Sequence, residues 1–395
     1  MQFFDEFALT MNITIVIDEL DMGGAQHVVY LLAKYLDKTE FSITIICTDG
    51  ARKNSHLEQQ MLRECTADGY KIIFLKNRDF VRLETPFALL NKIVNKICRI
   101  FVDCARILEL CKELPKTQPY VIHVHQHGIW AAYWALPHRI PLVTTIHTTP
   151  NVTFPRETEK IALHLSLLFR RNVFAAISQY NLDLIKSFWH LDDAHAYTIN
   201  NGIELGSYYT KVHDVFSFIN VSRQDKNKNQ QLIVHAFARL CRNSPEVRLY
   251  LVGDGECHEK LKQLAVELGI QEKVVFTGYI ASAIEYLSIS DAYISSSHRE
   301  GLPLSVLEAM AAHLPVIATD AGGVRDLAQE NGILVADNDE DGLLKAMHTL
   351  HDNADLRRQK GEKSFEMVQA FSAENMAAEY GALYKAVLQE AKHKQ

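Results

Sequence analysis

Short apolar runs that alternate with amphipathic stretches are the feature that most restricts how this chain can fold. Residues 13–17, 41–48 and 71–75 read as buried strands, and the first run leads into a helical pattern. A second series begins with the strand-like run 216–221 and a helical stretch over 231–241. Further strand-like runs follow at 249–252, 274–278, 291–294 and 316–319. Strands that alternate with helices predict an α/β fold built on parallel, doubly wound sheets.

Composition limits the class of protein. The 395 residues are enough for two domains of ordinary size, and 48% hydrophobic with 23% charged residues is typical of a soluble globular protein. A formal net charge of −7 argues against general nucleic-acid binding. No apolar run approaches the roughly 20 residues that span a bilayer, and the acidic start Met1-Gln-Phe-Phe-Asp-Glu does not resemble a secretory signal. Seven cysteines without Cys-x-x-Cys spacing favour reduced thiols. We therefore expect a cytoplasmic protein.

Two glutamates follow the run 291–294 in different settings. Glu300 is expected in a loop, whereas Glu308 lies in a helical pattern that has Pro303 in its first turn and Leu307 and Met310 facing the core. Eight residues at about 1.5 Å each would separate the carboxylates by roughly 12 Å along a helix. An acid and base that act on one bond lie roughly 5 to 9.5 Å apart. The spacing favours a ligand with two separate polar ends.

The segment that contains both glutamates, Glu300-Gly-Leu-Pro-Leu-Ser-Val-Leu-Glu308-Ala-Met-Ala, resembles a family signature. It is similar to the Glu-x7-Glu motif of retaining, nucleotide-sugar-dependent glycosyltransferases of the GT-B fold, family 4. The resemblance implies that Glu300 lies at the donor sugar and Glu308 at the nucleotide ribose. It also implies that the intervening backbone lies against the sugar and phosphates, at Gly301, Leu302, Pro303 and Leu304.

A basic loop follows the run 216–221. Arg223 offers a planar fork and Lys228 a mobile point charge, both near a helix N-terminus whose dipole favours anions. A solvated basic loop is the plain alternative. In the context of the family, Arg-x4-Lys-Asn resembles the diphosphate clamp, and Gly253 ends the next strand on the donor side.

Two glycines, Gly23 and Gly24, separate the first strand from the first helix. They permit a tight turn whose free amides can face an anion. A plain turn would have the same pattern. Their position resembles the N-terminal Gly-Gly loop of the family, which faces the donor phosphates and the acceptor pocket.

Three histidines, His123, His125 and His127, follow strand alternation, and His147 ends the next strand. Alternation puts the first three on one face, at the carboxyl end where α/β sheets bind ligands. A structural stack and a metal site are the alternatives, although no Cys, Asp or Glu lies nearby. The resemblance implies an acceptor-side histidine, for which we favour His125, with His123 or His127 as alternatives.

Residues 85–114 interrupt the alternation with one long amphipathic helix that ends before Pro115. The predicted apolar positions are Leu90, Ile93, Val94, Ile97, Phe101, Cys104, Ile107, Leu108, Cys111 and Leu114. Residues 71–116 contain ten basic side chains (Lys71, Lys76, Lys92, Lys96, Lys112, Lys116, Arg78, Arg82, Arg99 and Arg106) and five acidic ones (Asp79, Glu84, Asp103, Glu109 and Glu113), an excess of +5. The helix either faces the core with a solvated outer side or docks reversibly on an anionic membrane near a lipid-linked acceptor.

The resemblance covers nearly the whole chain and defines the expected organisation. It implies an acceptor-binding Rossmann-like domain over 1–205, a donor-binding Rossmann-like domain over 206–372, a cleft between them, and a helix over 373–395 that crosses back onto the first domain. Met376, Tyr380, Leu383, Tyr384, Val387 and Leu388 form the helical pattern of that last segment.

The resulting hypothesis is a glycosyltransferase that moves a sugar from a nucleoside diphosphate sugar to a glycan or lipid-linked hydroxyl with retention. Bacterial surface polysaccharide or glycolipid synthesis is the implied setting. Glu300, His125, Arg223 and Lys228 are the expected catalytic residues. No Asp-x-Asp motif occurs at an expected position, so no metal or other cofactor is expected. The alternatives are a sugar-nucleotide epimerase of the same two-domain plan and a nucleotide-sugar-binding protein without turnover.

Overall fold

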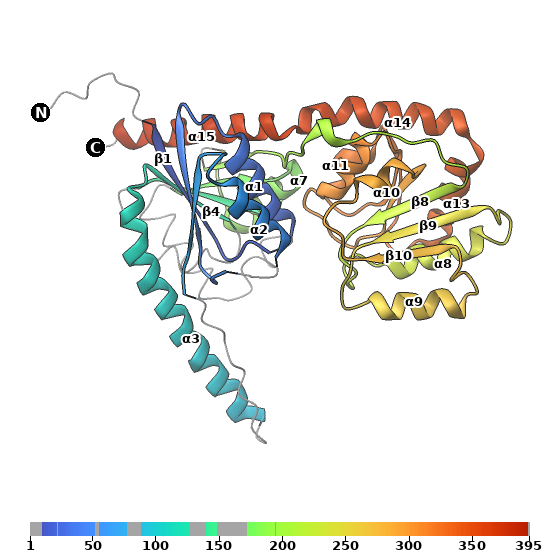
Figure 1. Ribbon diagram of the computed structural model, residues 1–395, viewed down its shortest axis with the longest axis horizontal. Coiled ribbons are helices and arrows are strands. Elements are labelled where there is room, and N and C mark those ends of the chain that lie inside the picture. Colours follow the sequence, from blue (N-terminus) through green and yellow to red (C-terminus); the bar gives the residue numbers. More distant parts are fainter. Residues whose placement is uncertain are drawn as a thin grey trace, which may run out of the picture. The chain divides into compact units, whose positions relative to one another are not determined.

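The structure is a computed structural model that describes residues 10–21, 23–51, 55–76, 88–125, 140–147, 172–193 and 195–393. The chain divides into two compact units, which we call the first unit (residues 1–199 and 376–395) and the second unit (residues 200–375). Each unit is built on one parallel sheet, which confirms the prediction of two Rossmann-like α/β domains (Figure 1).

The sheet of the first unit has seven strands in the order β3-β2-β1-β4-β5-β6-β7. The strands are β1 (Met11–Ile17), β2 (Phe41–Cys47), β3 (Tyr70–Phe74), β4 (Val121–His125), β5 (Leu142–Ile146), β6 (Asn172–Ala176) and β7 (Ala196–Thr198). Its helices include α1 (Gly24–Tyr35), α2 (His56–Glu64), α3 (Ala88–Glu113) and α7 (Gln179–Trp189). Strands β4, β5 and β6 are buried along their whole length, as expected for parallel strands covered on both faces.

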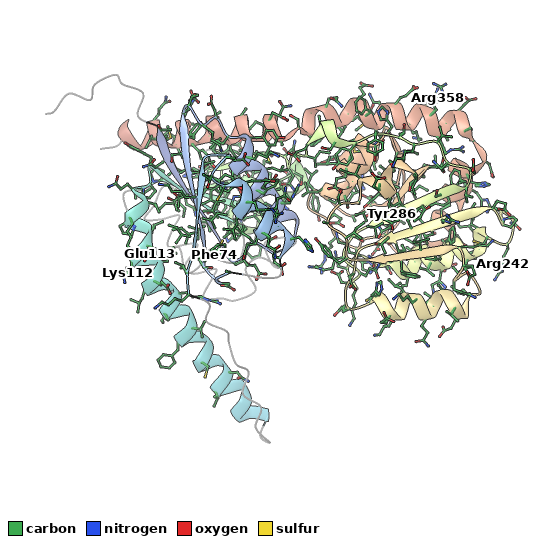
Figure 2. All side chains as sticks on the ribbon, viewed as in Figure 1. Phe74, Lys112, Glu113, Arg242, Tyr286 and Arg358 are labelled. Carbon is green, nitrogen blue, oxygen red and sulfur yellow. The ribbon has the colours of Figure 1, made fainter. Side chains whose placement is uncertain are left out.

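The sheet of the second unit has six strands in the order β10-β9-β8-β11-β12-β13. They are β8 (Phe216–Val221), β9 (Val247–Val252), β10 (Val274–Gly278), β11 (Ala292–Ser295), β12 (Val316–Thr319) and β13 (Gly332–Val335). The helices of this unit include α8 (Gln230–Leu240), α9 (His258–Glu267), α10 (Ile284–Ser288), α11 (Leu304–Ala311), α12 (Val324–Ala328), α13 (Glu340–Asp352) and α14 (Ala354–Val368). Charged side chains such as Arg242 and Arg358 lie on the outside of this unit (Figure 2).

Both sheets reverse strand order at one place. In the first sheet β1 lies between β2 and β4, and in the second β8 lies between β9 and β11. Loops that leave two neighbouring strands in opposite directions open a crevice at their carboxyl ends, where α/β sheets bind ligands. We call these two places the switch points. Strand β4 and the loops after β1, β8 and β11 contain most of the predicted site residues that the structure describes.

The last helix, α15 (Ala373–His393), confirms the predicted terminal helix. Its residues from Met376 onward belong to the first unit. Tyr380 and Tyr384, two members of its predicted apolar pattern, are almost completely buried there. The helix therefore forms part of the core of the first unit.

Helix α3 confirms the predicted long helix but corrects its apolar side. Leu110 and Leu114 pack into the core of the first unit. The side chains of Phe101 and Leu108 are each 71% exposed, and Cys104 and Cys111 are exposed as well. Helical spacing identifies an apolar stripe. Which side of this helix is buried depends on which side chains contact the rest of the unit. The predicted Thr85-Pro86 start lies outside the described residues.

One of the basic residues of α3 is paired with a carboxylate. The guanidinium of Arg106 forms an ion pair with Asp49, with Nη2 and Oδ1 3.1 Å apart. The side chains of Lys92, Lys96 and Arg99 lie outside the described part of the structure. Within the described residues, no helix combines the length and apolar character needed to cross a membrane.

Candidate functional site

The switch point of the second unit brings together the loop after β8 and the loop after β11. Asp225 organises the first of these loops. Its carboxylate accepts hydrogen bonds from the backbone amides of Asn227 at 2.9 Å and Lys228 at 3.1 Å, and from Nε of Arg223 at 2.6 Å. An aspartate that binds amides two and three residues ahead fixes a turn without regular secondary structure. The loop therefore presents Arg223 and Lys228 in one defined conformation.

Glycines allow the neighbouring strand end to approach this loop closely. Gly253 has a φ of +124°, and a Cβ atom there would lie 2.2 Å from the backbone oxygen of Ser222. Gly255, with a φ of +155°, would place its Cβ 2.4 Å from the backbone oxygen of Gln224. Any side chain would displace the loop after β8, because both obstacles are backbone atoms of that loop. Gly253 thus has a structural reason to be glycine, whatever its contact with a donor.

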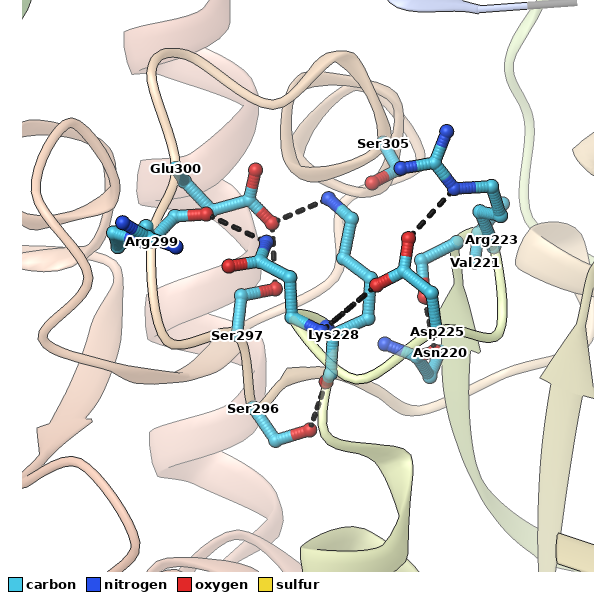
Figure 3. Close-up of polar contacts among 12 residues, drawn as sticks. Asn220, Val221, Arg223, Asp225, Lys228, Ser296, Ser297, Arg299, Glu300 and Ser305 are labelled. Carbon is cyan, nitrogen blue, oxygen red and sulfur yellow. Dashed lines mark hydrogen bonds and ion pairs between the residues drawn. The ribbon is translucent and has the colours of Figure 1, made fainter. Parts of the chain in front are cut away.

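Arg223 and Lys228, the two predicted site cations of this loop, have different surroundings. Nζ of Lys228 lies 2.6 Å from Oε1 of Glu300, and these side chains are only 20% and 10% exposed. Arg223 is 75% exposed and pairs only with Asp225 among the ion pairs of the described residues. Figure 3 shows the Lys228 ammonium pointing toward the Glu300 carboxylate, whereas the Arg223 guanidinium is bonded to the Asp225 carboxylate. The predicted diphosphate lysine and the predicted sugar glutamate are in direct contact.

Serines after β11 hold this contact in place. The hydroxyl of Ser297 donates to Oε1 of Glu300 at 2.5 Å, the same oxygen that Lys228 binds. The hydroxyl of Ser296 lies 2.8 Å from the backbone oxygen of Lys228 and 2.9 Å from that of Asn229 (Figure 3). Sequence reasoning missed these serines and Asp225. The run Ser295-Ser-Ser at a strand end, opposite a switch-point loop, was the available signal.

The backbone of Glu300 is fixed by the loop after β12. Its amide donates to the oxygen of Ala321 at 3.0 Å, and its oxygen accepts from the amide of Gly323 at 3.2 Å. Helix α11 then begins at Leu304, so Pro303 is the N-cap residue and not a member of the first turn as predicted. Leu302 is buried, and its backbone oxygen accepts from Nδ2 of Asn201 at 3.1 Å. The backbone from Gly301 to Leu304 is therefore anchored on both sides.

Glu308 lies inside α11, as predicted, directly after the buried Leu307 and one turn before the buried Ala311. Loss of solvation raises the pKa of its carboxyl to about 7. Tyr208 lies near Glu308. Burial raises the pKa of the Tyr208 phenol, and the negative charges of Glu308 and Glu204 raise it further. A carboxyl with this pKa changes charge near neutral pH, which makes it sensitive to a bound hydrogen-bond donor.

The first unit holds the histidines at its own switch point. His123 and His125 are fully buried at the end of β4, and their rings are tilted by 43° with centroids 4.1 Å apart. Nδ1 of His125 lies 2.8 Å from Nε2 of His147, and Nε2 of His125 is buried with no partner among the described residues. Burial lowers the pKa of His147 to about 3 and the pKa values of His123 and His125 well below the ordinary value. All three rings are neutral at physiological pH. His127 lies outside the described residues.

The glycine turn lies at the same switch point, after β1. Gly23 is the N-cap residue of α1 with an extended φ of −160°, and Gly24 is the first helical residue. A Cβ at Gly23 would lie 2.4 Å from the side-chain oxygen of Gln26, which is the end of a flexible group. The turn leaves the first amides of α1 available at the carboxyl end of the sheet.

Within the described part of the chain, no three His, Cys, Asp or Glu side chains are grouped so that they could hold a metal ion. The positive charge of the loop after β8 comes from Arg223, Lys226 and Lys228.

Three relatives illustrate what the chain is similar to. EpsD of Bacillus subtilis, which is named as a glycosyltransferase, is 32% identical over 177 residues, and the match spans 44% of this chain and 46% of that protein. The UDP-Gal:alpha-D-GlcNAc-diphosphoundecaprenol alpha-1,3-galactosyltransferase of Escherichia coli is 23% identical, over 84% of this chain and 86% of that protein. HepE of Anabaena, crystallised with UDP and glucose, matches with a TM-score of 0.74 and 18% identity, over 95% of this chain and 99% of that chain.

Two family matches cover both units. Residues 22–207 match the family described as Glycosyltransferase Family 4, and residues 209–367 match the family described as Glycosyl transferases group 1. The structural match to HepE supports the fold alone at its level of identity. The chain therefore has the two domains of a GT-B glycosyltransferase, a family 4 domain followed by a group 1 domain.

Proposed function

We propose that this protein transfers a sugar from a nucleoside diphosphate sugar to a lipid-linked glycan hydroxyl with retention of the anomeric configuration. The observation that carries the proposal is the contact between Lys228 and Glu300 at the switch point of the second unit. It places a cation suited to a diphosphate beside a carboxylate suited to sugar hydroxyls. In a nucleotide-sugar donor the diphosphate is bonded directly to the sugar, so its negative charge and its sugar hydroxyls lie side by side, as the cation and the carboxylate do here.

The chemistry follows from the charges. The bond between the anomeric carbon and the diphosphate oxygen breaks, and the diphosphate leaves with the electron pair. Lys228, Arg223 and the first amides of nearby helices are preorganised donors for that developing negative charge. The acceptor oxygen forms the new bond to the anomeric carbon on the face that the diphosphate leaves, and its proton passes to the leaving diphosphate oxygen. Glu300 holds the sugar hydroxyls, and Glu308 holds the ribose at the other end of the donor.

His125 is the proposed acceptor-side residue. Its Nε2 atom is buried and without a described partner, so an acceptor hydroxyl would satisfy it. Because burial holds the pKa of His125 well below its ordinary value, the ring is a weak base. We therefore assign it the role of a neutral hydrogen-bond partner that orients the acceptor. Gly23 and Gly24 are proposed to face the donor phosphates from the first unit.

The proposed acceptor and setting come from the relatives. The Escherichia coli relative is named for transfer from UDP-Gal to a GlcNAc-diphosphoundecaprenol. HepE of Anabaena was solved with UDP and glucose. We therefore propose a UDP-sugar donor, a diphospholipid-linked sugar acceptor, and a role in bacterial surface polysaccharide or lipopolysaccharide assembly. Arg223 and Lys228 would supply the positive charge that stabilises the leaving diphosphate, so we propose that no divalent ion is required.

The decisive experiment combines a panel of UDP-, GDP- and dTDP-sugars with GlcNAc-diphosphate on a shortened lipid tail. We expect one donor to give a glycosylated lipid whose new linkage has the donor's anomeric configuration by proton NMR, with or without EDTA. Inversion would reject the retaining assignment. An epimerised nucleotide sugar formed without acceptor, or donor binding without any turnover, would replace the proposal with one of the two alternatives.

We further propose that α3 docks the protein on an anionic membrane, at the cytoplasmic face where its acceptor would lie. The supporting observation is that Phe101 and Leu108 are each 71% exposed on a helix whose neighbours Leu110 and Leu114 are buried. Exposed apolar side chains on an amphipathic helix, with basic residues nearby, suit the boundary between headgroups and acyl chains. In Figure 1, α3 extends away from the sheet of the first unit.

A further inference from the structure

Two tyrosines of α15 are bonded to the strands that carry the histidines of the first unit. The hydroxyl of Tyr384 lies 2.7 Å from Nδ1 of His123, and the hydroxyl of Tyr380 lies 2.8 Å from Oγ1 of Thr145. Oγ1 of Thr145 in turn lies 2.7 Å from Nε2 of His123. All four side chains are almost completely buried. The end of the chain thus occupies both ring nitrogens of His123, one directly and one through Thr145.

The hydrogen-bonded chain leaves His123 one orientation. Each hydroxyl has a single proton, so the bonds run in one of two directions along Tyr384, His123, Thr145 and Tyr380. In both directions His123 is neutral, with one nitrogen donating and the other accepting. Flipping the ring would break both bonds in a buried setting, where unpaired polar groups are costly. Tyr384 and Thr145 therefore fix the plane of this ring and couple its tautomer to the direction of the hydrogen-bonded chain.

The fixed ring of His123 restricts the orientation of the neighbouring His125 ring. Their ring centroids are 4.1 Å apart, and the ring of Tyr380 lies 5.0 Å from that of His123. His125 is held on its other side by the 2.8 Å contact between its Nδ1 and Nε2 of His147. Among the rings of His123, His125 and His147, Nε2 of His125 is the one nitrogen that is buried without a hydrogen-bond partner within the described residues. The hydrogen bonds to His123 and to Nδ1 of His125 thus determine where the unpaired Nε2 of His125 lies.

We propose that Tyr384 and Tyr380 are positioning residues, through which the C-terminal helix sets the orientation of His125 toward the acceptor. The proposal rests on the proposed function for the role of His125. A helix that only braced the sheet could use phenylalanine at both positions, because the apolar rings alone would fill the space. The buried hydroxyls of Tyr384 and Tyr380 instead form hydrogen bonds with His123 and Thr145. Nε2 of His125 remains without a hydrogen-bond partner among the described residues.

The test removes single hydroxyls from the full-length protein. Tyr384→Phe and Tyr380→Phe keep the rings and delete the bonds to His123 and Thr145. Tyr70→Phe is the matched control, because Tyr70 is also buried in the first unit and its hydroxyl donates to the backbone oxygen of Met61, away from the histidines. Unfolding temperature then measures the general cost of losing a buried tyrosine hydroxyl.

Two measurements follow. Histidine-selective 15N NMR reads ring tautomers without substrate, and we expect Tyr384→Phe to shift the signals of His123 and His125, whereas Tyr70→Phe leaves them unchanged. Transfer to the GlcNAc-diphospholipid should fall by about tenfold to 100-fold in Tyr384→Phe, the scale expected for a misplaced reacting group. Donor hydrolysis without acceptor and UDP binding should keep their wild-type values, since both belong to the second unit.

The outcomes separate the two proposals. Unchanged histidine signals in Tyr384→Phe, or an equal loss of transfer in Tyr70→Phe, would overturn the positioning role while the transferase assignment stands. A wild-type protein without transfer would reject the proposed function, and the NMR comparison would then decide alone whether the tyrosines orient the histidines.

Discussion

Nζ of Lys228 and Oε1 of Glu300 lie 2.6 Å apart at the switch point of the second sheet, although 72 residues separate them in the chain. The hydroxyl of Ser297 binds the same carboxylate oxygen. The ion pair and the added hydrogen bond hold both charged groups in position in the absence of a ligand. A donor that enters this site must therefore exchange the contact for contacts of its own.

The first prediction concerns the two cations. Arg223→Ala should leave the unfolding temperature unchanged because the side chain is largely exposed, whereas Lys228→Ala should cost about 1 kcal/mol of stability by leaving Glu300 unpaired. Both should lower kcat by roughly 100-fold to 1000-fold, the effect of removing one preorganised donor. Steady-state kinetics and thermal melts provide the measurement. Wild-type turnover in both variants would refute the diphosphate assignment.

The second prediction separates the glutamates. Glu300→Gln should reduce transfer but leave UDP affinity equal to or tighter than wild type, because it releases Lys228 for the diphosphate. Glu308→Gln should weaken UDP itself, because it changes the group proposed to hold the ribose. Isothermal calorimetry with UDP distinguishes them, with Glu285→Gln, an exposed glutamate of the same unit, as the control. The opposite pattern would mean that the two ends of the donor are assigned backwards.

The third prediction follows from the pKa of Glu308, which burial raises from 4.5 to about 7. The folded protein holds this proton more tightly than the unfolded chain. The resulting stability is fully present below about pH 4.5 and is lost as pH rises through about 7. UDP affinity should change in the other sense, because ribose hydroxyls bind the ionised carboxylate better.

Calorimetry and melts at pH 6 and pH 8 test both signs. Glu308→Gln should remove the contribution of this carboxyl from each pH profile, whereas other titrating groups, including UDP itself, remain in the variant. If the variant kept the full wild-type pH dependence of UDP binding, Glu308 would not be the titrating group.

The fourth prediction concerns the membrane. Phe101→Ser together with Leu108→Ser should release the protein from anionic vesicles, because it removes exposed apolar area without touching the core. Val212→Ser, at a fully exposed valine of the second unit, is the matched control. Sedimentation with phosphatidylglycerol vesicles measures binding, and activity on a soluble acceptor analogue should persist.

Charge reversal provides a second arm. Reversing Lys92, Lys96 and Arg99 should weaken vesicle binding by about 1 kcal/mol for each residue near the surface, and added salt should imitate it. Arg106 is left out because its partner is Asp49. Sedimentation that neither substitution set changes would assign α3 to a role other than membrane docking.

Local patterns predicted the strands, the helices and the loops that carry the site, because periodicity and strand ends are properties of neighbouring residues. The contact between Lys228 and Glu300 was not predicted, since strand order in the sheet, and not sequence distance, makes β8 and β11 neighbours. Tyr380 and Tyr384 were expected from helical spacing only as apolar positions. Their hydroxyl partners lie 235 and 261 residues away and left no local signal.

Helix α3 shows the converse limit. The spacing of Phe101, Cys104, Leu108 and Cys111 marks one side of the helix correctly as apolar. It does not say whether protein covers that side, because burial depends on where the helix meets the sheet. Leu110 and Leu114 provide that contact instead.

The pairing of Arg223 and Lys228 with carboxylates of the same unit has a consequence for competition between anions. Arg223 pairs with Asp225 and Lys228 with Glu300, whereas Lys226 is an exposed third cation of the same loop. Orthophosphate would have to separate the two pairs to reach Arg223 and Lys228, and it would give the released Glu300 carboxylate only repulsion. The hydroxyls of the proposed nucleotide sugar would instead donate to that carboxylate, so we expect the internal pairing to make inorganic phosphate a poor inhibitor.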